Sequence, residues 1–424
     1  MTGRGRLLTI VALVALAAGG VLAWGRLRPR GPIKVGILHS LIGTMADSER
    51  PLVDATEMAI AEINAKGGVL GRPIEAVVAD GRSDPEVFAR QATRLITKDK
   101  VVAVFGCWTS GSRKTVKPIF EKYDNLLFYP LQYEGLEESP NIVYTGAAPN
   151  QQIIPALKWA LGNLGRRFYL VGSDYVFPRA ANAIIKDYVK RWRGQIVGED
   201  YILSGSQDVA GVVQKIVKAR PDVILNTING DTNIAFFKAL RAAGITPQKI
   251  PTMSFSIAEQ ELTALPRRDL AGDYAAWNYF QSIDSPRNHA FVRAFKARFG
   301  ASRVTSDPIE SAYVDVYLWA QAVEAAGTTN PDVIRRAVTE RSFDAPEGMV
   351  YVDGGNRNTW RTVRIGRIQP DGQFAIVWSS GYPIRPEPFP PERTRAQWNA
   401  FLNHLYTSWG DRWFNPGPAA APGR

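Results

Sequence analysis

Short apolar runs alternate with amphipathic stretches along most of the chain. The runs at 33–38, 74–79, 101–105 and 126–129 have the length of buried strands. Between them, apolar residues recur every three or four positions, which predicts helices of ten or more residues. Strands that alternate with helices in this way indicate βαβ units in a parallel sheet.

The same alternation starts again near Arg166 and predicts a second α/β series. Its expected strands are at 168–172, 195–201, 223–226 and 250–253. Two series favour two similar lobes over one sheet of about a dozen strands. Helical patterns return at 288–299 and 309–326, and three strand-like runs follow, so we expect the chain to cross back to the first lobe.

Length and composition narrow the class of protein. A chain of 424 residues exceeds one ordinary core, and 45% hydrophobic with 21% charged residues is globular. The formal charge of +11 comes from basic residues spread along the chain without interleaved aromatics, so nucleic acid is not an expected partner. Cys107 is the single cysteine, which excludes an internal disulfide and favours a buried thiol over a nucleophile.

The N-terminal residues 1–31 predict a targeting segment. Arg4 and Arg6 precede the uncharged stretch 7–24, and further arginines follow it. A cleaved signal peptide and an uncleaved membrane anchor both fit, because positive charge flanks the stretch on each side. Either alternative places the rest of the chain in the periplasm or elsewhere outside the cytoplasm, with residues 7–24 as a possible tether.

Residues 385–424 are predicted to form a Pro-rich linker and an amphipathic aromatic tail. The linker is RPEPFPP, and the helical pattern at 394–409 puts several aromatic and leucine side chains on one face. We expect this face to dock on its own protein, with a partner or membrane surface as the alternative. Deleting 392–424 is expected to leave ligand affinity unchanged.

The stretch 101–135 contains the candidate site. It reads as strand, turn, helix, strand, turn, and in a parallel sheet both turns lie outside the carboxyl ends of their strands, where such sheets bind ligands. Ser110 lies at or next to a helix N-cap, so a hydroxyl and free N–H groups are expected to meet a carbonyl or carboxylate oxygen. The alternative that Ser110 only caps the helix and Trp108 only packs remains open.

The motifs of common enzymes are absent from the sequence. His39, His289 and His404 are far apart and have no metal-ligand spacing, and no phosphate-binding loop or Gly-x-Ser-x-Gly motif occurs. The sequence therefore predicts no catalytic residue, no metal and no cofactor. A Ser–His–Asp site that uses Ser110 is kept as a weaker alternative.

Several ordered motifs resemble those of the urea and short-chain-amide binding proteins, which belong to the branched-chain amino-acid type of periplasmic binding proteins. These motifs are GCWTSGSRKTVKPIFE, SPNIVYTGAAPNQQIIPA, VGSDYVFPR and YFQSIDSP, and the similarity extends over about residues 33–388. The resemblance implies an α/β type I periplasmic-binding fold with two Rossmann-like lobes and a three-segment hinge. The implied lobes are 32–148 plus 279–345 and 149–278 plus 346–384, and the implied partner is an ABC permease.

The resemblance also implies a set of ligand-binding residues. They are Trp108, Thr109, Ser110, Tyr129, Gln132 and Tyr133 in the first lobe, and Tyr175, Asp231, Ser256 and Glu259 in the second. Carboxylate and amide oxygens would accept from the N–H groups of a small neutral amide, and the aromatic rings would enclose its plane. Two alternatives stay open: Tyr129 and Tyr133 as crevice walls, and Asp231 as a helix cap. A membrane-tethered amide or amino-acid sensor acting on a signalling partner is the second hypothesis, and an amidohydrolase is the third.

Overall fold

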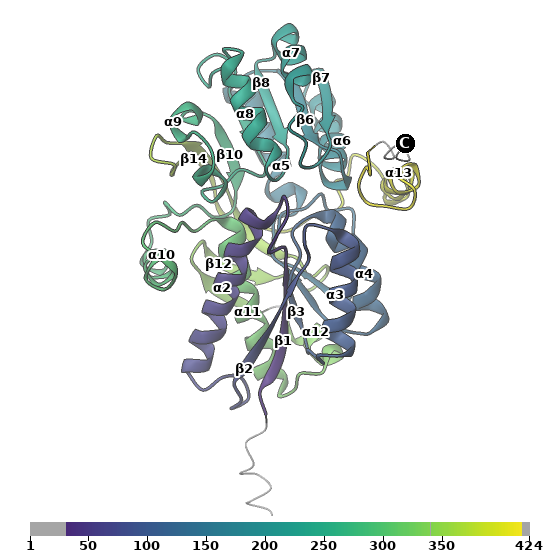
Figure 1. The fold of residues 1–424 in the computed structure, drawn as a ribbon, viewed down its shortest axis with the longest axis vertical. Coiled ribbons are helices and arrows are strands. Elements are labelled where there is room, and N and C mark those ends of the chain that lie inside the picture. Colours follow the sequence, from purple (N-terminus) through teal and green to yellow (C-terminus); the bar gives the residue numbers. More distant parts are fainter. Residues whose placement is uncertain (1–30, 340, 418–424) are drawn as a thin grey trace, which may run out of the picture.

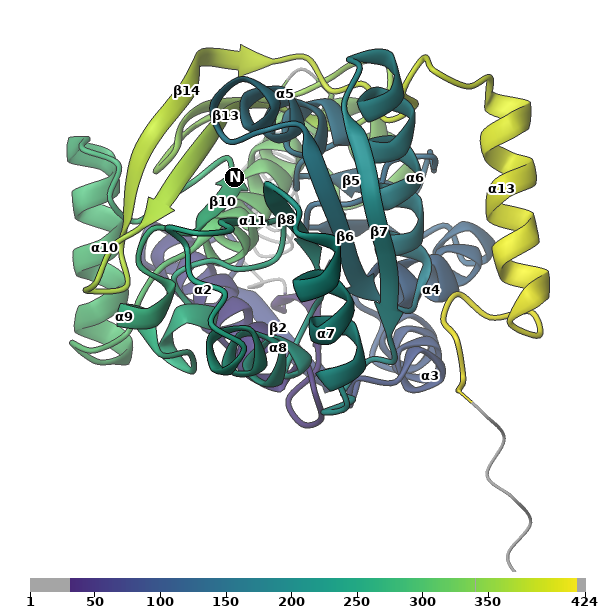
Figure 2. The same cartoon turned by 90° about the horizontal axis from the view of Figure 1, so that it is seen from above.

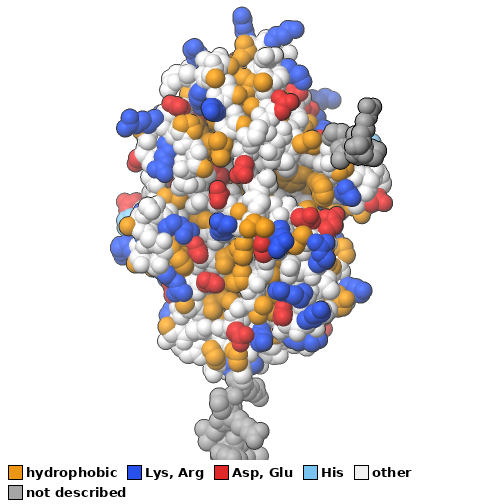
Figure 3. All heavy atoms as spheres, in the orientation of Figure 1, with side chains coloured by type: hydrophobic (Ala, Val, Ile, Leu, Met, Phe, Trp, Pro, Cys, Tyr) orange, Lys and Arg blue, Asp and Glu red, His pale blue; other side chains and the backbone are white. Residues whose placement is uncertain are grey.

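The chain folds into two α/β lobes, one above the other, in the computed structural model, which describes residues 31–339 and 341–417 (Figure 1). The predicted α/β class and the two-lobe arrangement are confirmed. On the face seen in Figure 3, acidic and basic side chains are interspersed over both lobes. That view agrees with the spread of the basic residues along the sequence.

The first lobe is built on a five-stranded parallel sheet in the order β2-β1-β3-β4-β5. Its strands are β1 (Ile33–His39), β2 (Ile74–Asp80), β3 (Val104–Gly106), β4 (Leu127–Tyr129) and β5 (Ile142–Tyr144). Its helices are α2 (Ala46–Ala65), α3 (Pro85–Thr97), α4 (Ser110–Lys122), α10 (Pro286–Phe299), α11 (Asp307–Ala326) and α12 (Pro331–Ala337). Trp319 of α11 packs edge-on against Phe105 of β3, so a helix from late in the chain completes the core.

The second lobe has the strand order β7-β6-β8-β9-β10 in its parallel part, and β13 continues the sheet in the antiparallel direction. Its strands are β6 (Arg167–Ser173), β7 (Gln195–Ile202), β8 (Val223–Thr227), β9 (Thr252–Ser254) and β10 (Tyr274–Trp277). Its helices are η1 (Pro149–Gln151), α5 (Ile153–Asn163), α6 (Val176–Arg191), α7 (Ala210–Ala219), α8 (Thr232–Ala242), η2 (Glu261–Thr263) and α9 (Arg267–Leu270).

The three strand-like runs expected after the helices form an antiparallel meander, but it begins one strand earlier than expected and belongs to both lobes. It consists of β11 (Ser342–Ala345), β12 (Gly348–Val352), β13 (Thr359–Ile368) and β14 (Phe374–Ile384), paired in sequence order. Val350 and Val352 of β12 are buried in the same core cluster as Val35 and Phe105. Residues 348–352 therefore pack in the first lobe, whereas the sequence boundary at 345 had assigned them to the second.

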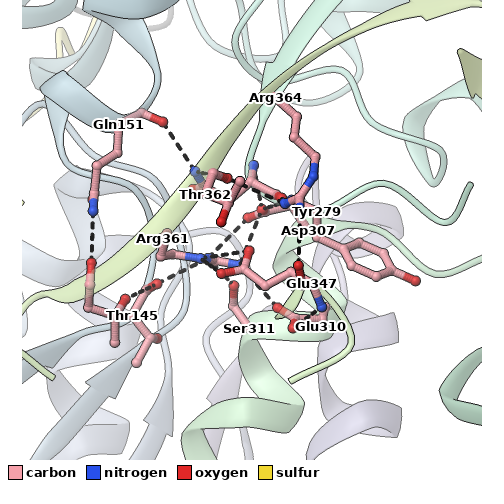
Figure 4. A network of polar contacts seen from close by, with 12 residues as sticks. Thr145, Gln151, Tyr279, Asp307, Glu310, Ser311, Glu347, Arg361, Thr362 and Arg364 are labelled. Atoms are coloured by element: carbon pink, nitrogen blue, oxygen red, sulfur yellow. Dashed lines mark hydrogen bonds and ion pairs between the residues drawn. The ribbon is translucent and has the colours of Figure 1, made fainter. Parts of the chain in front are cut away.

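The chain passes between the lobes three times, and one buried ion network contacts all three passages (Figure 4). Arg361, at the start of β13, lies 2.7–3.4 Å from carboxylate oxygens of Asp307, Glu310 and Glu347. It also donates a 3.0 Å hydrogen bond to the carbonyl of Thr145, just after β5. Asp307 accepts from the backbone N–H of Tyr279, just after β10, at 2.8 Å. A single guanidinium thus connects the three hinge segments.

The C-terminal helix α13 (Arg395–Ser408) lies beside α6 at the edge of the molecule (Figure 2). Trp398, Leu402 and Leu405 are buried in the core cluster of the second lobe, so the expected docking of the tail on its own protein is found. The Pro-rich segment is fixed as well, because the Pro388 carbonyl accepts from the N–H of Leu136 at 2.7 Å.

The predicted targeting segment, residues 1–31, lies outside the described residues apart from Gly31. In the described part of the chain, no helix combines the length and the apolar character needed to cross a membrane.

Candidate functional site

A cavity of about 350 Å³ lies between the lobes, at the carboxyl ends of the central strands. In the first sheet β2 lies on one side of β1 and β3 lies on the other. In the second sheet β7 lies on one side of β6 and β8 lies on the other. The pairs β1/β3 and β6/β8 are therefore topological switch points. Open α/β sheets bind ligands at these points. The lining residues are Thr44, Met45, Glu49, Ser83, Pro85, Phe88, Thr109, Gly111, Ser112, Tyr175, Leu203, Ser204, Asn229, Phe414, Asn415 and Pro416.

The first lobe presents the N-termini of three helices to this cavity. Met45 precedes α2, Pro85 is the first residue of α3, and Thr109 caps α4 by accepting from the backbone N–H of Ser112 at 3.0 Å. The first turn of a helix has N–H groups without intrahelical acceptors and carries a partial positive charge. This wall therefore suits a ligand that presents a carbonyl or other electron-rich oxygen.

Glu49 of α2 is the one carboxylate among the lining residues given above, and none of them is Lys or Arg. Its side chain is buried, and its Oε2 accepts from the backbone N–H of Ser40 at 2.7 Å and lies 3.2 Å from His39 Nδ1. Both contacts within the described chain use the same oxygen. Oε1 is therefore available to accept from an N–H group of a ligand.

The second lobe supplies aromatic, apolar and amide groups to the cavity. Tyr175 follows β6 and is buried, and Asn229 follows β8, where its backbone N–H donates to Ser173 Oγ at 3.1 Å. Leu203, after β7, adds an apolar side chain. The cavity therefore has an apolar part next to groups that donate and accept hydrogen bonds, which suits a small amphipathic and uncharged ligand.

The lobes contact each other beside this cavity. Ser48 of α2 donates a 2.8 Å hydrogen bond to Glu261 of the second lobe. Pro51 lies inside α2 and has no N–H, so it cannot donate the usual helical hydrogen bond to the carbonyl of Asp47. The Asp47 carbonyl accepts from Nε2 of Gln260 in the second lobe instead, at 3.2 Å. A Cβ on Gly230 would lie 2.8 Å from the Thr44 carbonyl oxygen, so only glycine fits at this contact.

Two of the sequence-predicted residues, Thr109 and Tyr175, line the cavity directly. Trp108 lies next to them but is buried in the first-lobe core, and its carbonyl accepts from the Tyr129 hydroxyl at 2.6 Å. Trp108 therefore corresponds to the alternative in which it only packs.

Three predicted residues surround a buried cation instead of the cavity, which corrects the expectation from the sequence. The guanidinium carbon of Arg113 lies 4.7 and 4.8 Å from the ring centres of Tyr129 and Tyr133. Ser110 Oγ donates to Glu134 at 2.5 Å and accepts from Arg113 at 3.1 Å. The aromatic enclosure exists, but the planar group inside it is the protein's own arginine, because α4 turns this side chain inward.

Lys114 and two glutamates complete this cluster, which we call the Arg113 cluster (Ser110, Arg113, Lys114, Tyr129, Tyr133, Glu134 and Glu137). Arg113 lies 3.1 Å from Glu134 and 2.9 Å from Glu137, and Lys114 lies 2.8 Å from Glu137. Burial opposes ionisation of Glu137, but Lys114 and Arg113 outweigh it and hold its pKa well below the ordinary value. The cluster is a buried network of ion pairs and hydrogen bonds in the first lobe.

The remaining predicted residues lie away from the 350 Å³ cavity. Gln132 donates to the Phe255 carbonyl of the other lobe at 3.0 Å, and the hydroxyl of the neighbouring Ser256 is buried without a partner in the described chain. Asp231 precedes α8 without a side-chain capping bond and lines a second space of about 280 Å³ between the lobes. Burial and the nearby Asp47 raise the pKa of Asp231.

Glu259 is a buried carboxyl group that we expect to make stability depend on pH. Burial raises its pKa to about 8, although its Oε1 accepts from the Gln281 N–H at 2.7 Å. The folded state therefore binds the proton more tightly than the unfolded state, and this contribution to stability is lost as pH rises from about 4.5 to about 8.

Glu259→Gln mimics the neutral form at every pH. We predict that the free energy of unfolding falls less from pH 5 to pH 8 in this variant than in the wild type, by at least about 1.4 kcal/mol. Urea denaturation at both pH values measures this difference. Glu75→Gln, on the half-exposed strand β2, is the matched control and should leave the pH dependence unchanged. Parallel wild-type and Glu259→Gln profiles would show that Glu259 ionises normally.

The sequence reasoning missed Glu49, Asn229, Leu203 and the C-terminal residues of the cavity. A signal for the first three was available, because each follows a predicted strand, and the strand-end rule applies to β1, β7 and β8 as it does to β3. For the C-terminal residues no local pattern existed, since their position depends on how α13 docks.

The described residues also contain no arrangement of three or more His, Cys, Asp or Glu side chains that could hold a metal ion. Cys107 is fully buried, and burial raises the pKa of its thiol far above the ordinary value, as expected for a packed side chain.

Comparison with known proteins places this architecture among periplasmic solute-binding proteins. A sequence model of the family described as "Periplasmic binding protein domain" matches residues 33–395. The Leu/Ile/Val-binding protein of Escherichia coli is 23% identical over 350 residues, which cover 80% of this chain and 92% of that protein. A solute-binding protein of an ABC transporter from R. palustris, solved with 4-hydroxybenzoate, has a TM-score of 0.74 at 22% identity, covering 82% of this chain and 96% of that one.

One shorter match is of a different kind. Limonene hydroxylase of Geobacillus stearothermophilus is 36% identical over 118 residues. That match covers 28% of this chain, and the chain spans only 22% of the length of that protein.

Proposed function

Because this chain belongs to the periplasmic binding protein family, we propose that it is an extracytoplasmic solute-binding protein that captures urea or a short-chain aliphatic amide and delivers it to an ABC permease. The lobes close over the ligand by bending at the three hinge segments. The observation that carries the proposal is the charge of the cavity: Glu49 and three helix N-termini face it, and no Lys or Arg is among its lining residues.

The chemistry of an amide matches this distribution of groups. Its carbonyl oxygen would be held at the N-termini of α2 and α4, and its N–H groups would donate to Glu49. A carboxylate ligand such as a benzoate or an amino acid would meet the carboxylate of Glu49, and no Lys or Arg is among the lining residues to bind it. An amide therefore fits this cavity better than the ligands named for the related structures.

The volume of the cavity bears on the choice between urea and a longer amide. A water molecule occupies about 30 Å³ in the liquid, so 350 Å³ is about twelve times that volume. Urea alone would leave most of the space to water, whereas an aliphatic chain would lie against Phe88, Leu203 and Tyr175. The apolar walls thus favour an amide with a short alkyl group.

Isothermal titration calorimetry with urea, formamide, acetamide, butyramide, leucine and benzoate tests the proposal. We predict one-to-one binding of at least one amide without turnover. We also predict that Glu49→Gln weakens that binding at least tenfold, since a hydrogen bond to a charged group contributes about 1.5–3 kcal/mol.

Glu57→Gln on the same helix, outside the cavity, is the matched control and should bind as the wild type does. Binding of leucine or benzoate alone would contradict the amide proposal, and release of ammonia would favour the amidohydrolase alternative. The sensor alternative rests on a membrane tether at residues 7–24 and on the aromatic tail, and the second lobe covers the apolar face of α13 in that tail.

A further inference from the structure

We propose that the C-terminal segment Trp413–Pro416 forms a third wall of the ligand site, and that Phe414 determines which ligands fit. This inference deepens the proposed function and rests on ligand binding in the cavity described above. Phe414, Asn415 and Pro416 all line that cavity, between groups contributed by the two lobes. This proposal is the opposite of the expectation from the sequence that deleting residues 392–424 leaves ligand affinity unchanged.

The segment is held in place by specific contacts with the second lobe. The carbonyl of Trp413 accepts from the N–H of Val176 at 3.0 Å, and Phe414 forms an antiparallel bridge with Tyr175. Asn415 donates to Asp174 twice, from its backbone N–H at 3.0 Å and from its side-chain amide at 2.6 Å. The segment is thus ordered by the same loop that carries Tyr175 into the cavity.

The N-terminus of α6 lacks a local cap, and the segment Trp413–Pro416 supplies one. Tyr175 occupies the N-cap position of α6 but makes no side-chain capping bond. The first N–H of the helix would then lack a protein acceptor, and the Trp413 carbonyl supplies it. Trp413, about 240 positions later in the sequence, therefore acts as the cap of α6.

The segment also reaches the first lobe. Lys114 Nζ of α4 lies 5.0 Å from the ring centre of Trp413, and a Cβ on Gly111 would lie 3.8 Å from the Trp413 carbonyl oxygen. The segment therefore borders the cavity and contacts both lobes.

The role of Phe414 follows from its chemistry. Asn415 uses its side-chain amide and carbonyl in bonds to Asp174 and Gly417, and Pro416 has no donor. Phe414 is half-buried and contributes a large apolar surface that fills part of the cavity. Shortening it enlarges the apolar part of the site, and enlarging it does the reverse. Differences of one methylene are discriminated about 10- to 200-fold by apolar sites of this kind.

The test compares full-length variants by calorimetry with formamide, acetamide, butyramide and hexanamide. For Phe414→Ala we expect at least fivefold weaker binding of the preferred short amide. We also expect at least a fivefold shift of the affinity ratio toward the longer amides. Phe414→Trp should shift the ratio toward shorter amides, which loss of structure alone would not do. A chain that ends at Arg412 should bind the preferred amide at least tenfold more weakly.

Phe401→Ala is the matched control, because Phe401 is a half-buried aromatic residue of α13 that packs on the second lobe outside the cavity. It should leave the ratio of affinities unchanged. Wild-type selectivity in both Phe414 variants, or an equal shift in Phe401→Ala, overturns the inference while the proposed function stands. A wild-type protein that binds no ligand of either panel overturns the proposed function, and this inference with it.

Discussion

Replacement of Arg361 by methionine should lower the free energy of unfolding by about 3–5 kcal/mol, because it removes the cation that forms ion pairs with three buried carboxylates. Asp307, Glu310 and Glu347 all lie within 3.4 Å of this guanidinium, and their side chains are at most 1% exposed. Burial and the neighbouring Glu347 already raise the pKa of Glu310 well above its ordinary value. Removing the positive charge should raise the pKa values of Glu310 and Glu347 further.

The loss should therefore be larger at pH 8 than at pH 5, where protonation relieves the unpaired charge. Denaturant unfolding at the two pH values measures both effects. Arg367→Met, at an exposed position of the same strand, is the matched control and should change stability by no more than about 0.5 kcal/mol. Adding Glu347→Gln to Arg361→Met should recover part of the loss. Equal stability of the Arg361 and Arg367 variants would mean that the network does not hold the hinge segments.

Replacement of Arg113 by methionine is expected to have the second-largest effect, a loss of about 3 kcal/mol, at the lower end of the range for a broken buried pair. The loss is smaller because Lys114 remains 2.8 Å from Glu137 and 3.6 Å from Glu134. Contacts of the guanidinium with Tyr129 and Tyr133 are lost as well. Thermal and denaturant unfolding at pH 7 measure the change.

Lys117→Met is the control on the same helix, where Lys117 forms a partly exposed pair with Glu121, and surface pairs of this kind contribute at most about 1 kcal/mol. Arg113→Lys should recover only part of the stability, because an ammonium cannot lie flat between two rings and donate to both glutamates. An Arg113→Met variant as stable as Lys117→Met would show that the cluster is energetically no more than a surface pair.

Most of the architecture was predictable from the sequence because it follows from local periodicity. The apolar runs near Ile33, Ile74, Phe168 and Val223 form strands of the two parallel sheets, and the return of helices at 288–326 correctly indicated that the first lobe is discontinuous. The short strand β11 and the first-lobe position of β12 were missed, because both depend on pairing with each other and with β13 rather than on a pattern of their own.

The site was harder to predict because its groups are selected by contacts between distant residues. Arg113 lies in a polar helical turn and looks exposed in the sequence, yet Glu134 and Glu137 neutralise it after folding and draw it between the tyrosines. Because the rings of Tyr129 and Tyr133 pack against the buried Arg113, they do not line the cavity. Phe414 was missed for the opposite reason, since an aromatic residue near the end of a chain carries no local mark of a binding role.

The discontinuity of the first lobe also sets the order in which the molecule can be assembled during synthesis. Its sheet emerges first, but α11 and β12, which complete its core, are made only after the entire parallel part of the second lobe. Domains made of local contacts form early, whereas contacts between distant segments must wait for loop closure. The second lobe waits even longer, because Ile365 of β13 and Trp398 of α13 belong to its core and are made after β12. Neither lobe can therefore reach its native packing before the other has been largely synthesised.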